Sequence, residues 1–348
     1  MRENQFLQWV LNQPIGGGAR NAHAQHGGPA NPNVILGPGD DMAVVALPGP
    51  GASPNIAARS LAFLKIDQAL DQVHFDLRQH TPQQAGRKAV NRCLSDCAAM
   101  ACCPLAVLIS VALPRIADLA FAQALFTGCQ AAADDSQCAI VGGDTAVWNQ
   151  RLAITVAALG AAPQGVLITR AGAKAGDAIC VTGRLGGSIL GRHMEFSPRI
   201  ALAQEIIKSA HVHAMMDLSD GLAADLPRIC AASGVGAMVR ANLLPVHPDA
   251  QLLAAQDGLS ASRHALVDGE DYELLMALAP AEAQKLLKLG GADGATPVTV
   301  IGHFTEERRL ALCDAAGAVT PWPAGFEHQS AGAEAPECAS PNGGRATS

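Results

Sequence analysis

MMDLSDGLAADL, residues Met215–Leu226, is the stretch around which the fold is predicted to be organised. Its apolar lead predicts a strand that ends at Asp217, and the pattern after the turn predicts a helix capped by Ser219 or Asp220. Capping needs one oxygen-bearing side chain, whereas this turn carries three. The surplus indicates ligation of a hard cation such as Mg²⁺, which prefers carboxylate oxygens. Pro227 predicts a kink or an early end of that helix.

Composition bounds the class of protein. The 348 residues are enough for about two domains. A hydrophobic fraction of 49% with only 3% aromatic residues predicts a core of Ala, Val, Leu and Ile. The formal net charge of −7 argues against nucleic acid or an acidic membrane as a partner, because both need a basic surface. Any phosphate ligand must then be met by local cations or metal ions.

Cysteine usage and apolar runs indicate the compartment. Ten cysteines are scattered without CxxC pairs or zinc-type spacing, so we expect small buried hydrophobic residues in a reducing compartment. The segment MRENQFLQWVLNQ carries Glu3 where a signal peptide needs an unbroken apolar region. The longest apolar run, Leu105–Leu113, is too short to span a bilayer. We therefore expect a cytoplasmic protein.

The order of strand and helix patterns predicts the domains. Strands and helices interleave over residues 1–162, which predicts an N-terminal α/β (α+β) domain. A second domain is expected at residues 163–328, followed by a disordered tail at 329–348 that is small, polar and contains proline. Residues 15–33 are predicted to be a loop. Thr81, Pro82 and Gln84 have the form of a helix start, with Thr81 as N-cap.

Acidic residues recur at expected strand ends and in apolar surroundings. Asp41 follows a Gly-Pro-Gly turn, and strand alternation predicts that only one of Asp40 and Asp41 points into any one site. Asp67 is expected at the end of a strand. Asp96 lies in an apolar helix, where a carboxylate is costly unless it is paired or metal-bound. Asp144 follows two glycines that allow close backbone approach at the expected end of another strand.

Gathered in one place, these acids could not all remain ionised without divalent cations, and an acidic cleft with several Mg²⁺ ions suits a nucleotide triphosphate. Arg170 and Lys174 offer cations for phosphate, although a solvated hinge between domains is an equally good interpretation. For His74 the residues alone favour a hydrogen-bonded, partly buried histidine. The six atypical acids are Asp41, Asp67, Asp96, Asp144, Asp217 and Asp220.

Eight segments together resemble the thiamine-monophosphate kinase family, in the superfamily of aminoimidazole ribonucleotide synthetase and selenophosphate synthetase. They occur in the family's order between about residues 35 and 328. The segments are GPGDDMAVV, KIDQALDQVHFDL, GRKAVNRCLSDCAAM, IVGGDTA, LITRAGAKAGD, MMDLSDGLAADL, DGEDYELL and AGFEH.

The resemblance implies a fold, a reaction and roles for residues. It implies an N-terminal α/β domain that forms a homodimer, a C-terminal α/β domain, and phosphorylation of thiamine monophosphate by ATP to thiamine diphosphate. The six acids would hold Mg²⁺. The residues implied to contact ATP are Gly143, Asp144, Arg170 and Ser219. Those implied to contact thiamine monophosphate are His74, Glu270 and Phe326, with Trp322 near Phe326. Those implied to be catalytic are Asp67, Asp96, Asp144, Arg170 and Asp220.

The chain departs from the family pattern at three places. Lys65 and Ile66 stand where the family usually has hydroxyl residues that ligate metal, Ala101 replaces a glycine, and the segment 191–198 is short. We hypothesise that the Lys65 ammonium replaces part of one metal's charge. Two alternatives remain: an enzyme of the same fold with a different phosphorylated acceptor, and a nucleotide-binding homologue without catalysis.

Overall fold

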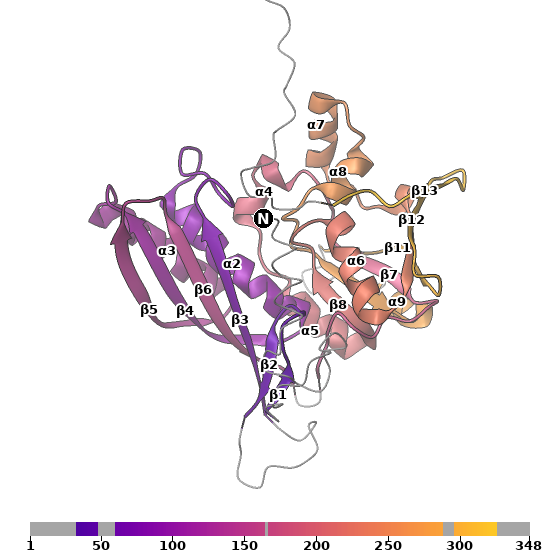
Figure 1. Ribbon diagram of the computed structural model, residues 1–348, viewed down its shortest axis with the longest axis horizontal. Helices are drawn as coiled ribbons and strands as arrows, with labels where there is room; N and C mark the ends of the chain where they lie inside the picture. The colour runs from indigo at the N-terminus through magenta and orange to yellow at the C-terminus, as the bar shows by residue number, and fades with distance from the viewer. Residues whose placement is uncertain (1–32, 48–59, 164–165, 288–295, 326–348) are drawn as a thin grey trace, which may run out of the picture.

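A computed structural model describes residues 33–47, 60–163, 166–287 and 296–325 of the chain. These residues form two α/β units, one on each side of the molecule in Figure 1. Phe326, the predicted tail and nearly all of the predicted loop 15–33 lie outside the described residues. No helix in the described part of the chain is long and apolar enough to cross a membrane.

A six-stranded sheet forms the N-terminal unit. Its strands are antiparallel except for β4 and β5, which run parallel. Two strands extend further than the sequence predicted, since neither the strand with Asp67 nor the strand with Asp144 ends at its acid. In spatial order the strands are β1 (Val34–Leu36), β2 (Ala43–Ala46), β3 (Leu61–Leu70), β6 (Ala153–Ala161), β4 (Cys103–Pro114) and β5 (Ala139–Trp148).

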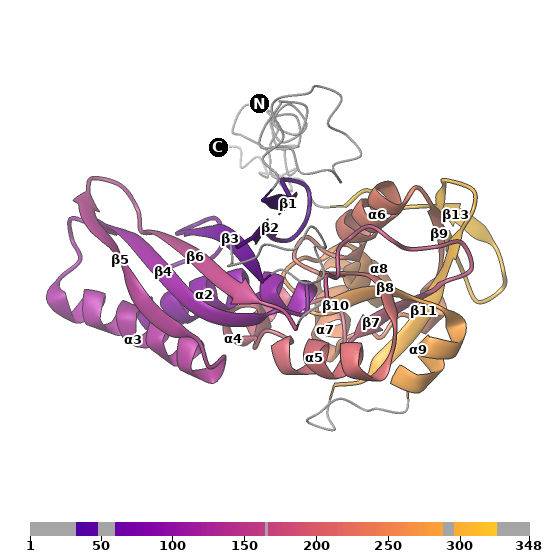
Figure 2. The ribbon, with the colours of Figure 1, turned by 90° about the horizontal axis from the view of Figure 1, so that it is seen from below.

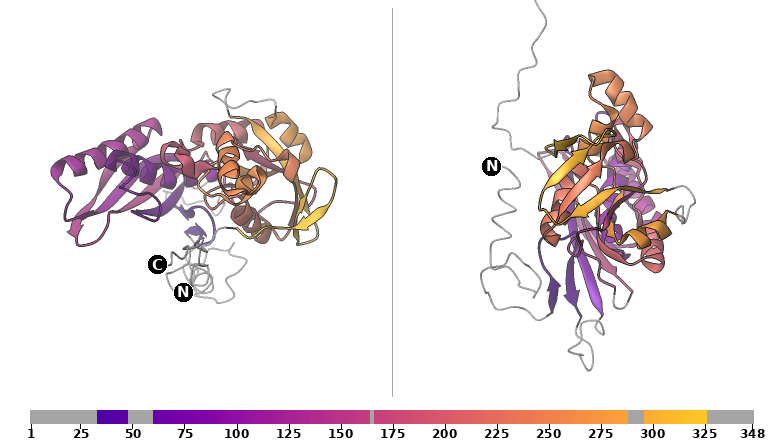
Figure 3. Two further views of the ribbon diagram at one scale, coloured as in Figure 1. Left: turned by 90° about the horizontal axis from the view of Figure 1, so that it is seen from above. Right: turned by 90° about the vertical axis from the view of Figure 1, so that its right-hand side faces the viewer.

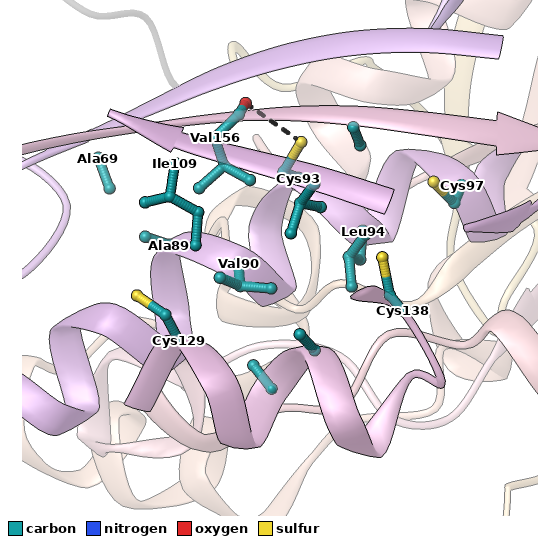
Figure 4. Close-up of a cluster of buried hydrophobic side chains, with 14 of the residues drawn as sticks. Ala69, Ala89, Val90, Cys93, Leu94, Cys97, Ile109, Cys129, Cys138 and Val156 are labelled. Carbon is teal, nitrogen blue, oxygen red and sulfur yellow. Dashed lines mark hydrogen bonds between the residues drawn. The ribbon is translucent and has the colours of Figure 1, made fainter. Parts of the chain in front are cut away.

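Helices α2 (Pro82–Ala99) and α3 (Leu119–Asp135) cover one face of this sheet, as Figure 2 shows. The predicted start of α2 is confirmed. The Thr81 side chain accepts from the Gln84 backbone N–H, and the Gln84 side chain accepts from the Thr81 backbone N–H. Gly86 lets the two helices approach closely, because a Cβ there would lie 2.2 Å from the Leu125 carbonyl oxygen. Figure 4 shows Cys93, Cys97, Cys129 and Cys138 in the core beneath.

The opposite face of the six-stranded sheet is not covered by any described element (Figure 2). The apolar run Leu105–Leu113 lies in β4, and it is only half buried: one face of β4 packs on the helices and the other is open. Strand pairing places Ile66, Ala157, Leu108 and Gly142 in one row across this open face. Ile66 is 68% exposed. The open face thus carries an apolar row that no described element covers.

A seven-stranded sheet forms the C-terminal unit. It is antiparallel apart from the parallel pair β9 and β12. In spatial order its strands are β13 (Val319–Pro321), β12 (Leu310–Cys313), β9 (Gly236–Arg240), β11 (Val298–Thr305), β7 (Ala178–Thr182), β10 (Leu274–Leu278) and β8 (Val212–Asp217).

Helices pack on both faces of the seven-stranded sheet, and Figure 3 shows this layered arrangement. Alternate residues of β7, β8 and β10 enter two separate cores, one with α6 and α8 and the other with α5 and α9. The α/β fold class predicted from the sequence is confirmed. The helices are α4 (Arg192–Glu195), α5 (Ile200–Ser209), α6 (Leu222–Ser233), α7 (Pro248–Asp257), α8 (Ala261–Val267) and α9 (Pro280–Leu286).

The start of α6 corrects the predicted cap. Neither Ser219 nor Asp220 caps the helix; its N-cap is Gly221, which has φ +89° and makes no side-chain capping bond. A Cβ at Gly221 would lie 2.4 Å from the Asp268 carbonyl oxygen, so glycine is needed for this close approach. The carboxylate of Asp225 instead reaches back and accepts from the Asp220 backbone N–H at 3.0 Å. Ser219 and Asp220 therefore keep their side chains free of the capping role.

Pro227 does not end α6, which continues to Ser233. Proline lacks the N–H that would bond to the carbonyl of Ala223, four residues earlier. The indole Nε1–H of Trp322 donates to that carbonyl at 2.9 Å. A distant donor thus replaces the missing helical bond, and the predicted early end is wrong for this reason.

This replacement predicts an energetic coupling between Trp322 and Pro227. Trp322→Phe should destabilise the protein by about 1–3 kcal/mol, because it leaves the Ala223 carbonyl without a donor. In a Pro227→Ala background the backbone N–H of residue 227 can satisfy that carbonyl, so the same substitution should cost clearly less. Urea unfolding of the four proteins of this double-mutant cycle measures the coupling. Strictly additive changes would contradict the assignment.

Candidate functional site

Three carboxylates from distant parts of the chain meet between the two units. Asp41 precedes β2, Asp96 lies in the last turn of α2, and Asp217 is the last residue of β8. One oxygen of each lies within 4.8 Å of the others. All three residues are at most 6% exposed. We call these three residues the carboxylate cluster.

Local structure fixes the members of the cluster. The β8–β10 pairing ends with Asp217 opposite Leu274, and the Leu218 backbone N–H continues the ladder by donating to the Glu273 carbonyl at 2.8 Å. Ser95, one residue before Asp96 on α2, donates its hydroxyl to Asp217 Oδ2 at 2.6 Å. This contact joins the N-terminal unit to the C-terminal unit at the cluster.

Two cations contact the carboxylate cluster. Lys65 Nζ, on β3, lies 2.7 Å from Asp96 Oδ1. The Arg170 guanidinium donates to Asp41, and its backbone N–H donates to Asp40. Asp40 and Asp41 therefore both contact Arg170, but only Asp41 belongs to the carboxylate cluster, in line with the prediction that one of the two acids points into a site. Both acids precede β2, so strand alternation is not the reason. Arg170 lies between the units, as a hinge would, yet it is engaged with acids.

Burial dominates the electrostatics of these acids. It raises the pKa of Asp217 to about 6 and that of Asp40 to about 7, in both cases with help from the Asp41 charge. Burial also raises the pKa of Asp96 well above its ordinary value, while Lys65 opposes this shift. Asp41 Oδ2 is a buried oxygen with no hydrogen-bond partner among the described residues. An unsatisfied oxygen within an all-oxygen cluster suits a hard cation such as Mg²⁺.

Asp67 and Asp220 lie outside the carboxylate cluster. Asp67 shares a face of β3 with Lys65, and its carboxylate lies 3.3 Å from Arg92 Nε on α2. Asp220 follows β8 and pairs with Arg228. The side chains of both acids remain 24% and 30% exposed, respectively. They flank the cluster and are accessible to a ligand.

Gly143 and Asp144 lie on the edge strand β5, and β6 and β4 separate them from β3. A Cβ at Gly143 would lie 1.9 Å from the Ile109 carbonyl oxygen, so this glycine allows the predicted close backbone approach. Asp144 pairs with Ser110, which lies in register with Thr155, whose hydroxyl accepts from the Gln68 side chain on the open face. Asp144 thus faces away from α2 and is not part of the cluster.

The predicted acceptor residues His74 and Glu270 are joined by Lys88. Lys88 Nζ donates to the Glu270 carboxylate at 2.8 Å and to the His74 carbonyl. The His74 ring accepts from the Leu70 backbone N–H at 3.0 Å, so the interpretation as a hydrogen-bonded, partly buried histidine is confirmed. Glu270, with φ +61°, also donates its backbone N–H to the Ser219 carbonyl at 2.7 Å. The residues predicted to bind thiamine monophosphate therefore lie next to the turn that carries Ser219 and Asp220.

Several functional neighbours were not singled out from the sequence. Lys88, Arg92 and Asp96 are spaced four residues apart on α2, so they lie on one side of the helix. Lys88 is fully buried, like the apolar residues around it. Charged residues repeating at this spacing in an apolar helix were the signal that could have found Lys88 and Arg92 together with Asp96.

Comparison with known proteins first defines the class. Residues 39–162 match the family model for AIR synthase related protein, N-terminal domain, and residues 190–314 match that for the C-terminal domain. Two α/β units that enclose a carboxylate cluster are thus of the AIR synthase related type.

Individual relatives then define the family. The chain is 40% identical over 271 residues to the thiamine-monophosphate kinase of Rhodopirellula baltica, which covers 78% of this chain and 84% of that protein. It is 31% identical to the thiamine-monophosphate kinase of Caulobacter vibrioides, with 83% and 86% covered. A structure of AaThiL complexed with AMPPCP and TMP superimposes with a TM-score of 0.70 at 26% identity, covering 84% of this chain and 91% of that one. The chain belongs to the thiamine-monophosphate kinase family, which confirms the resemblance.

Lys88 gives the site a pH-dependent contribution to stability. Burial lowers its pKa to about 8 from 10.5, despite the Glu270 charge. The unfolded chain therefore binds this proton more tightly than the folded protein. The free energy of unfolding of wild type, relative to Lys88→Met, should be constant below pH 8. It should rise by about 1–3 kcal/mol as the pH increases from about 8 to 10.5, the folded and unfolded pKa values of Lys88. Urea unfolding of both proteins across this range measures the difference. A difference that stays flat or falls with rising pH would contradict the role of burial.

Proposed function

We propose that this protein transfers the γ-phosphoryl group of ATP to thiamine monophosphate, giving thiamine diphosphate, with Mg²⁺ as cofactor. The carboxylate cluster carries the proposal: three buried acids from separate segments lie within 4.8 Å of one another and beside Arg170. The relatives named thiamine-monophosphate kinase, and the similar structure complexed with AMPPCP and TMP, support ATP and thiamine monophosphate as the substrates.

Asp41, Asp96 and Asp217 are the residues that would hold Mg²⁺, with Asp67 and Asp220 at the margin. Bound there, magnesium supplies charge neutralisation for the nucleotide phosphates. The Asp41 oxygen that has no hydrogen-bond partner among the residues described in the structure suits such an ion. Because the pKa of Asp217 is raised to about 6, that carboxyl is ionised above this pH and ready to ligate.

The chain's own residues then supply positioning. A phosphate monoester oxygen is already ionised, so the reaction needs no strong general base, and catalysis rests on alignment and charge. We assign Arg170 to the nucleotide phosphates, since its guanidinium lies at the cluster and between the units. Ser219 joins it on the nucleotide side. Glu270 and His74 are assigned to the acceptor, and Lys88 holds both in place.

The open face of the six-stranded sheet suggests a homodimer in which each copy completes its partner's site. Asp144 and the apolar row of Ile66, Leu108 and Ala157 lie on this face. Within one chain the sheet itself separates Asp144 from α2 and hence from Asp96. A second copy packed on the open face would bury the apolar row and would carry Gly143 and Asp144 to the neighbouring site.

The reaction is tested with purified protein, ATP, Mg²⁺ and thiamine monophosphate. We expect thiamine diphosphate to form, and Asp217→Asn to lower kcat by about 10²-fold or more, because it removes charge from the cluster. Asp249→Asn, which alters an ion pair with Arg192 away from the cluster, is the matched control and should retain activity. Turnover only with another phosphorylated acceptor would favour an enzyme of the same fold that acts on that acceptor. ATP binding without turnover would favour a nucleotide-binding homologue without catalysis.

Complementation tests the shared site. Asp144→Asn and Asp217→Asn should each have very little activity alone. If Asp144 serves the partner's cluster, mixing the two variants should restore roughly a quarter of wild-type activity, because half of the dimers are mixed and each has one intact site. If Asp144 served its own chain, every site in the mixture would be defective. A monomeric protein in light scattering, or no recovery after subunit exchange, would refute the arrangement.

A further inference from the structure

Lys65 occupies a cation position inside the site. It lies on β3 with its side chain on the α2 side of the sheet, whereas Ile66 points to the open face. Its ammonium lies 2.7 Å from Asp96 Oδ1, and its side chain is 24% exposed. Asp96 is itself a member of the carboxylate cluster. The ammonium therefore contacts a carboxylate that belongs to the candidate cation site.

The charges of the site are already partly balanced by protein groups. Arg170 contacts Asp41, the Ser95 hydroxyl contacts Asp217, and Lys65 contacts Asp96. Each member of the cluster thus has its own protein partner. Lys65 and Arg170 together bring two positive charges to the three carboxylates. The cluster therefore needs less added cation charge than three unpaired acids would need.

Arg92 extends the same arrangement to Asp67. Its Nε lies 3.3 Å from the Asp67 carboxylate, and its side chain is 15% exposed. One cation of the protein thus accompanies each acid, Arg92 beside Asp67 and Lys65 beside Asp96. Asp67 is also not part of the carboxylate cluster. The protein's own cations therefore offset part of the negative charge of both acids.

We propose that the Lys65 ammonium takes the place of one divalent cation. The carboxylate cluster is then held together without metal, and it binds one divalent ion fewer than the same site would bind without Lys65. An ammonium is a compact, strongly hydrated point charge with three donors, and it offsets a carboxylate without coordination geometry. A phosphate of the nucleotide can accept from the same group, so part of the bridging between acids and phosphates passes through the protein. This inference rests on the proposed function only for the use of Mg²⁺.

A simple structural ion pair is the competing explanation, and metal dependence separates the two. A structural pair would stabilise the fold equally with or without Mg²⁺. A resident cation is interchangeable with a divalent ion. Removing it should therefore destabilise the metal-free protein and be compensated when Mg²⁺ is added.

The test uses Lys65→Met, which removes the charge at similar length, and Lys65→Thr, which offers a hydroxyl ligand. Lys285→Met is the matched control, since it removes an ammonium 2.7 Å from Glu282 outside the site. The melting temperature is measured in EDTA and in Mg²⁺. Bound Mn²⁺ per chain is counted by electron paramagnetic resonance with a non-hydrolysable ATP analogue. Neither measurement needs the acceptor, so failure here is distinguishable from failure of the kinase reaction.

In EDTA we expect Lys65→Met and Lys65→Thr to melt about 5 °C or more below wild type, because a buried carboxylate loses its partner. Saturating Mg²⁺ should close most of that gap, and both variants should bind about one more Mn²⁺ per chain than wild type. Lys285→Met should show neither effect. An equal loss of melting temperature in EDTA and Mg²⁺, an unchanged Mn²⁺ count, or variants that fail to fold even with Mg²⁺ would each overturn the proposal.

Discussion

Mutual repulsion among buried carboxylates is the constraint on which the rest of this structure depends. Asp41, Asp96 and Asp217 could not remain ionised within 4.8 Å of one another without nearby positive charge. The surrounding chain meets this constraint at specific points. Lys65 and Arg170 supply the charge, and the Ser95 hydroxyl supplies a donor. One oxygen of Asp41 has no hydrogen-bond partner in the described part of the chain, and it is there that we propose an added cation.

The same contacts hold the two units together. Helix α2 belongs to the N-terminal unit, yet it contacts β8 and α5 of the other unit. Ser95 and Asp217 form one polar connection between the units, and Lys88 and Glu270 form a second. Because both connections lie at the site, the relative position of the units and the charge state of the site are thermodynamically linked. Cation binding between the units should therefore also stabilise their arrangement.

Local features of the sequence predicted much of this, and non-local ones did not. The capping box at Thr81 was predictable because all its bonds lie within four residues. Asp96 was predictable because an acid in an apolar helix needs a partner, although the sequence could not show that Lys65 is that partner. The continuation of α6 through Pro227 depends on Trp322, almost a hundred positions away. The face of β5 on which Asp144 lies depends on strand register, which no local pattern fixes.

Lys65 and Ile66 are adjacent residues of β3 that affect two different surfaces. Because side chains alternate along a strand, Lys65 enters the site while Ile66 enters the open face. The effects of the lysine and of the isoleucine at these positions are therefore separate. The lysine adds positive charge among buried acids, and the isoleucine, 68% exposed, adds apolar area to the face that we assign to a second copy. The charge balance of the site and the attraction between copies can thus change independently, although adjacent residues of one strand control both.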